Sequence, residues 1–523
     1  SLSLERAVHY YEAAATAKPT GRRALRGLVH SYRQMGDDRR AAAATERLLE
    51  QFDPSEPSAI DLRMGIASFL STTPETLPRA LDHARIVLEA RPDDARALQL
   101  MADLLDRAGQ GVAAAELLER LAARERNRDR LHDILLRRAK LLAAEPDQQD
   151  AALDAIERAA NLNPGNRETV SLFVDQLERA GQTDRIAAYL GPIRNAVGAN
   201  IGRGAVSLRD LALLAKVARM VHPALARMAD ALVGAIEPTG EVAVEIAGPS
   251  PAALRQFIDR ADARLALLAE GEPPPLHALL AAIDGAVARL GHEFPSIGPS
   301  DLAPMPKGEG GTVLLEVARK LAELSQTRAP RLQASSTHNT VIFLQDPLPT
   351  VRLGVNLWNL GDELAMRGLV AVAFARLAFG APRVRGLPPV AIDLLLAASF
   401  EISGVFNPLT ADPDPRVLGE LVAQLRNLLP RRHLKAVEDA CKALAGHTFD
   451  PGSTARAIRA SDLRLATLLT GDASCTLSAA CALDGVMGGS LKQRTNRSRS
   501  AQDLLAHLIG DDFIAAAVQL GTL

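Results

Sequence analysis

Residues 98–121 read LQLMADLLDRAGQGVAAAELLERL, and this stretch decides the fold of the first part of the chain. On each side of Gly109 the apolar residues recur at helical spacing, as in two amphipathic helices joined by a tight turn. Ala102 and Ala114 are small enough to let the two helices approach closely, and the leucines around them fill the remaining space. Gly109 stands where the first helix must end, a position that favours positive φ. The stretch therefore predicts a helical hairpin.

The same frame recurs along about 200 residues. Successive units end at Pro19, Pro54, Pro92, Arg126 and Pro164, which gives spacings of 35, 38, 34 and 38 residues. Gly36 and Gly181 repeat the position of Gly109. The two longer units predict lengthened loops at residues 71–78 and 146–150. Such regularity is typical of an array of helix pairs that stack on one another.

This frame resembles the tetratricopeptide repeat (TPR), a family of helix pairs with a period of about 34 residues. Ala7, Tyr11, Ala14 and Pro19 fill the family's second-helix positions, but no matching first helix precedes them. We therefore expect the array to begin midway through a repeat of a longer protein, whose N-terminal targeting information is missing here. The resemblance implies a superhelix with a concave groove over residues 1–200.

In this family, four positions of each first helix line the groove. In the second repeat they are Arg23, Arg26, His30 and Arg33, a basic row. In the sixth repeat they are acidic or neutral: Glu168, Ser171, Asp175 and Glu178. The functional interpretation is a groove that binds an extended or helical segment of a partner protein, with the four basic residues as contacts. The alternative is an ordinary solvated face.

Composition limits the other possibilities. A chain of 523 residues is too long for a single hydrophobic core, so it should form two or three domains. Only 3% of its residues are aromatic, so alanine and leucine supply most of the apolar surface, which favours close-packed helices. A net charge of −2 argues against nucleic acid as a partner. Three late cysteines form no disulfide framework and no zinc pattern, which favours a reducing bacterial cytoplasm. No run of apolar residues is long enough to span a membrane.

The remaining sequence predicts three further regions. Residues 201–292 continue as helices, either degenerate repeats or a cap, with a short strand at 241–246. Residues 293–311 are rich in Pro and Gly and predict a linker. Residues 312–523 predict a small α+β domain, with strands near 331–334, 340–344 and 351–355 and a mobile basic loop at 488–499. The fold class is thus mostly α, a TPR-type α-solenoid followed by a helical region and an α+β domain.

The order of elements in residues 312–523 resembles the HExxH zinc metallopeptidases of the CAAX-processing and membrane heat-shock type. In those enzymes a segment like Asp362–Ala365 introduces the zinc-binding helix, where this chain has Val370, Ala371 and Phe374 in place of the ligands and base. The family's third ligand, a Glu four residues before an Asp, corresponds to Ile458 before Asp462. Apolar side chains cannot bind zinc, so the resemblance implies an inactive domain with no metal and no cofactor. An unrelated α+β domain with a purely structural helix is the alternative.

These observations together predict a non-catalytic scaffold or adaptor whose array binds a partner protein or peptide. An enzyme of the hydrolase class, with a repeat array that regulates it, is the alternative. A structural subunit of a larger assembly is a third interpretation.

Overall fold

The chain forms two compact units, Ser1–Tyr189 (unit 1) and Leu190–Leu523 (unit 2). This computed structural model describes residues 2–523 except 55, 72, 164–165, 238–247, 288, 291–301, 304–308, 325–326, 336–340, 345–348, 355–361, 410–412 and 451. The division lies at Tyr189, close to the predicted end of the array near residue 200. Unit 2 combines the predicted helical region 201–292 with residues 312–523, and the predicted strand at 241–246 lies outside the described residues.

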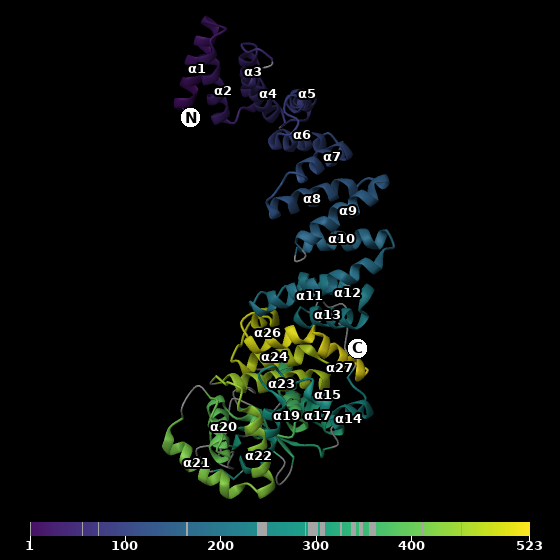
Figure 1. The fold of residues 1–523 in the computed structure, drawn as a ribbon, viewed down its shortest axis with the longest axis vertical. Helices are drawn as coiled ribbons and strands as arrows, with labels where there is room; N and C mark the ends of the chain where they lie inside the picture. Colours follow the sequence, from purple (N-terminus) through teal and green to yellow (C-terminus); the bar gives the residue numbers. More distant parts are fainter. Residues whose placement is uncertain are drawn as a thin grey trace. The chain divides into compact units, whose positions relative to one another are not determined.

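Unit 1 is a succession of helices in which each element packs against the next one along the chain (Figure 1). The first helices of the repeats are α2 (Arg22–Met35), α4 (Pro57–Leu70), α6 (Ala95–Arg107), α8 (Arg128–Ala143) and α10 (Arg167–Arg179). The second helices are α1 (Leu2–Ala17), α3 (Asp38–Leu49), α5 (Leu77–Ala90), α7 (Gly111–Ala122) and α9 (Gln149–Leu162). The helix α11 (Ala187–Gly202) starts in unit 1 and continues into unit 2. The predicted α-solenoid is therefore present.

The turns of unit 1 have the predicted chemistry. Gly36, Gly109 and Gly181 have φ values of 73°, 73° and 66°, which L-residues with a Cβ rarely adopt. The lengthened loops each form one turn of 3-10 helix, η1 (Pro74–Thr76) and η2 (Pro146–Gln148). A third such turn, η3 (Thr183–Ile186), precedes α11. The insertions thus lengthen the connections and leave the helix pairs intact.

Unit 2 contains most of the remaining helices. They are α12 (Leu208–Val221), α13 (Pro223–Ile236), α14 (Pro251–Asp259), α15 (Ala261–Leu265), α16 (Pro274–Val287), α17 (Glu309–Leu324), α19 (Glu363–Ala378), η5 (Val384–Gly386), α20 (Pro389–Ser403), α21 (Pro415–Leu428), α22 (Arg431–Leu444), α23 (Ser453–Thr470), α24 (Ala473–Leu483), α25 (Leu491–Thr495), α26 (Arg499–Leu508) and α27 (Asp511–Gln519). One core contains side chains of α16, α20, α21, α22 and α23. Because α16 belongs to this core, the region before residue 293 is part of the fold of the later helices.

A four-stranded sheet lies in unit 2, in the order β1-β2-β4-β3. Its strands are β1 (Leu302–Ala303), β2 (Arg331–Ser335), β3 (Val341–Leu344) and β4 (Thr350–Gly354). Parallel pairing joins β2 to β4, with Arg331 opposite Thr350, and the other two pairings are antiparallel. Three of the strands were predicted. The predicted linker 293–311 differs, because residues 302–303 form β1 and residues 309–311 begin α17; its other residues lie outside the described ones.

Helix α19 is the central element of unit 2 and contacts α17, α23, α24 and β3. Every residue from Leu369 to Arg376 is buried, so this helix has almost no solvent face. At Gly368 it crosses α24 so closely that a Cβ would lie 2.2 Å from the carbonyl oxygen of Cys475. Only glycine permits this approach of two backbones.

Candidate functional site

The predicted basic row lies on the exposed surface of α2. Arg23, Arg26, His30 and Arg33 follow one another at spacings of three, four and three residues, which places them on one side of the helix. All four are exposed, while Leu25, Leu28 and Tyr32 between them are buried. Among the described side chains, none forms an ion pair or hydrogen bond with any of the four. The row therefore presents its charge to solvent.

Several charged side chains on the first helices of the later repeats form ion pairs with one another. Arg137 of α8 forms ion pairs with Asp103 and Asp106 of α6, the latter at 2.8 Å between Nη2 and Oδ2. Lys140, one turn further along α8, pairs with Glu168 of α10. Because side chains of three successive first helices reach one another, these helices share one continuous surface.

The electrostatics of this paired surface can be seen at Arg137. Partial burial of its guanidinium opposes the charge, but the hydrogen bonds to Asp106 and Asp103 outweigh burial and raise the pKa of Arg137. Each partly exposed pair contributes about 0.2–1 kcal/mol to stability, so its larger effect is to neutralise the surface. The negative charge at the predicted acidic end of the groove is reduced in the same way, because Glu168 is paired with Lys140.

Ion pairs also connect successive second helices. Arg79 of α5 pairs with Glu46 of α3, and Arg158 of α9 pairs with Glu119 of α7 at 2.9 Å between Nη1 and Oε1. The unpaired row on α2 therefore differs from the surfaces of α6 to α10, where charges of opposite sign meet across the repeats.

The positions predicted to replace zinc ligands are in the protein interior. Val370, Ala371 and Phe374 on α19 and Ile458 on α23 are at most 1% exposed. Ile458 packs in the core shared with α16, α20 and α22. Within the described part of the chain, no group of three or more His, Cys, Asp or Glu side chains is arranged to hold a metal ion.

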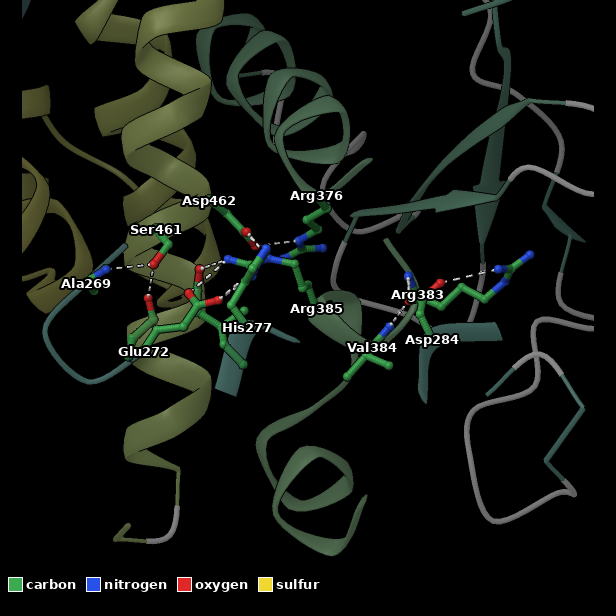
Figure 2. A network of polar contacts seen from close by, with 12 residues as sticks. Ala269, Glu272, His277, Asp284, Arg376, Arg383, Val384, Arg385, Ser461 and Asp462 are labelled. Atoms are coloured by element: carbon green, nitrogen blue, oxygen red, sulfur yellow. Dashed lines mark hydrogen bonds and ion pairs between the residues drawn. The ribbon is translucent and has the colours of Figure 1, made fainter. Parts of the chain in front are cut away.

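Asp462, the acidic residue retained from the peptidase frame, is fully buried in a network of charges (Figure 2). Its carboxylate accepts hydrogen bonds from Nε of Arg376 on α19 at 2.8 Å and from Nε of Arg385 in η5 at 2.6 Å. Arg385 also donates to Glu272 at 3.0 Å and lies over the ring of Phe379, 4.4 Å from its centroid. The network thus joins α19, η5, α23 and the segment before α16.

With every group ionised the network is neutral, with two guanidinium groups and two carboxylates, although burial raises the pKa of Asp462 and lowers the pKa of Arg376. Burial opposes the ionisation of Glu272, but the charge of Arg385 and hydrogen bonds hold the pKa of Glu272 below its ordinary value. The opposing carboxylates likewise outweigh burial and raise the pKa of Arg385. Because both arginines donate to protein oxygens, this arrangement is suited to joining segments of the fold. Sequence reasoning identified Asp462 but missed its partners.

The cysteines of unit 2 are also interior groups. Cys441, Cys475 and Cys481 are free and buried. Burial raises the pKa of the Cys481 thiol to about 11, which leaves little reactive thiolate near neutral pH.

Neither a family model nor a curated protein matches the chain. Among solved structures, it is similar to YrrB, described as a TPR protein with an unusual peptide-binding site, at 18% identity over 32% of this chain and 82% of YrrB, with a TM-score of 0.27. It is also similar to MamA, at 16% identity over 32% of this chain and 87% of MamA, with a TM-score of 0.27.

By its own repeat geometry, the chain is a TPR-like helical-repeat protein, mostly α, with a small α+β region in unit 2. Across the described residues, no helix combines the length and the apolar character that a membrane span requires.

Proposed function

We propose that this protein is a non-catalytic scaffold or adaptor that binds a partner protein through the surface formed by the first helices of unit 1. Arg23, Arg26, His30 and Arg33 are the proposed contacts. The observation that carries the proposal is the difference between these four unpaired residues and the paired charges of α6, α8 and α10. An exposed row of like charge on an ordered helix gives nothing to the stability of the array, whereas it is available to a partner.

The absence of peptidase chemistry is part of the same proposal. Val370, Ala371, Phe374 and Ile458 fill the positions that the peptidase resemblance assigns to zinc ligands and the base, and their buried, apolar side chains support an inactive domain. The charge network around Asp462 supports a structural role for the one acidic residue that is retained. A reducing compartment, as in a bacterial cytoplasm, is consistent with three free thiols.

Partner capture by the full chain tests the binding surface. The variant R23E/R26E is compared with R39E/R47E, which reverses two exposed charges on α3 of the same repeat. Quantitative mass spectrometry of proteins captured from the source cell should show a partner retained by the wild type and R39E/R47E and lost from R23E/R26E. Circular dichroism should give the same melting temperature for all three, because exposed substitutions change stability by at most about 0.5 kcal/mol. If R23E/R26E captures the same proteins as the wild type, the surface is wrongly assigned.

Metal analysis tests the second part of the proposal. The purified full chain should contain no stoichiometric zinc, and it should not cleave casein with or without a chelator. Stoichiometric zinc together with chelator-sensitive cleavage would establish the enzyme alternative.

A further inference from the structure

The charge of the row on α2 defines the chemistry of its partner. Resting on the proposed function, we infer that the partner segment carries several Asp or Glu side chains that pair with Arg23, Arg26 and Arg33. The row extends from Arg23 to Arg33, ten residue steps along one helix, or about 15 Å at 1.5 Å per residue. A segment with acidic residues distributed over a similar length can contact all three guanidinium groups at once.

Neighbouring carboxylates of the protein are already engaged. Glu12 of α1 accepts a hydrogen bond from the hydroxyl of Tyr32, and the side chain of Asp37 accepts one from the backbone of Arg40 at the start of α3. Asp37 also forms an ion pair with the Arg40 side chain at 3.4 Å. In the described part of the chain neither carboxylate forms an ion pair with the α2 row, so the positive charge of the row is available to a partner.

Arginine is suited to such a partner. Its planar guanidinium presents paired donors that match the two oxygens of a carboxylate, and it keeps its charge at every physiological pH. Exposed pairs of this kind contribute modestly to affinity, so the row acts mainly on orientation and association rate.

A nucleic acid fits the same surface less well. Binding to nucleic acid depends on many contacts between basic side chains and phosphates, whereas the α2 row has four basic residues. Further along the first-helix surface, Asp103, Asp106 and Glu168 contribute negative charge next to each arginine or lysine. The net charge of −2 for the whole chain points the same way.

Fluorescence anisotropy with defined probes tests the inference on the full chain. The probes are a labelled peptide of about twelve residues with alternating Glu and Ala, the same peptide with Gln for Glu, and a single-stranded DNA of equal length, each at about 50 and about 300 mM salt. We expect the Glu peptide to bind roughly tenfold more tightly than the Gln peptide at low salt and to weaken at high salt. R23E/R26E should weaken Glu-peptide binding by about tenfold, while R39E/R47E should stay within about threefold of the wild type.

Each remaining outcome overturns the inference in a distinct way. Equal binding of the Glu and Gln peptides, or no binding of either below about 1 mM, would exclude an acidic partner. The proposed function would still stand if R23E/R26E lost its captured partner. Tighter binding of DNA than of the Glu peptide would identify a nucleic-acid surface. An equal loss in R39E/R47E would show nonspecific attraction to positive charge.

Discussion

Replacing Asp462 with asparagine removes the charge that holds the two buried arginines of unit 2 together. Asp462 is 0% exposed and accepts hydrogen bonds from Arg376 and Arg385 at 2.8 and 2.6 Å. In D462N the shape is kept, but Arg376 loses the carboxylate with which it is paired, and Arg385 keeps only that of Glu272. Removing one partner of a buried ion pair costs about 3–5 kcal/mol. This is a large part of the roughly 5–15 kcal/mol that stabilises a typical domain.

Hydrogen exchange of the full chain measures this loss where it occurs. Peptides from α19 and α23 should lose protection by about a hundredfold to a few thousandfold, which is 3–5 kcal/mol at 1.36 kcal/mol per factor of ten. Peptides from α7 in unit 1 serve as an internal reference. D439N, an exposed change on α22, should leave all three within about 0.5 kcal/mol of the wild type. Protection of α23 within tenfold of the wild type in D462N would refute the assigned role of the network.

A paired substitution separates the loss of charge balance from a loss of packing. R376M/D462L removes one charge of each sign and leaves Arg385 paired with Glu272. Because the remaining charges balance, this variant should be more stable than D462L alone by about 1–3 kcal/mol. If the two variants are equally unstable, packing and not charge explains the cost.

Three further substitutions have outcomes that the local geometry determines. Gly368→Ala should destabilise unit 2 by about 1–3 kcal/mol because its Cβ would overlap the backbone of Cys475. Gly419→Ala lies at an open helix position and should stabilise unit 2 by up to about 1 kcal/mol. Thermal melts of the two variants should therefore shift in opposite directions. Burial lowers the pKa of His507 to about 3, so the unfolded chain takes up a proton before the folded chain does as the pH falls from about 6.5. The free energy of unfolding, measured by urea denaturation, should therefore fall by about 2 kcal/mol by pH 5 in the wild type but not in His507→Met. Gly109→Ala should cost about 1 kcal/mol, since φ is 73° there; an unchanged melt of unit 1 would contradict the assigned turn.

Features that depend on nearby residues could be predicted from the sequence. The positive φ of Gly36 and Gly109 follows from where each helix must end, because only a few residue types can adopt that conformation. The two long repeats could be recognised by counting, and their extra residues form η1 and η2.

Features that depend on distant residues could not be predicted in this way. Glu272 and Arg385 are separated by 113 residues, and neither lies in a local pattern that indicates a charged partner. The segment at 488–499 was predicted as a mobile loop from its basic, Gly- and Ser-rich composition. It contains α25, where Ser490 and Gln493 form a capping box and Arg494 is buried beside Asp362. The half-buried carboxylate of Asp362 decides this outcome, and it lies 132 residues away in the sequence.

The ion pairs between successive repeats have a mechanical consequence. In unit 1 they connect second helices through Arg79 and Arg158 and first helices through Arg137, so bending or stretching the array changes the distances between opposite charges. These pairs are partly exposed, and dissolved ions screen them over about 10 Å at 0.1 M salt. The resistance of unit 1 to bending should therefore fall as ionic strength rises.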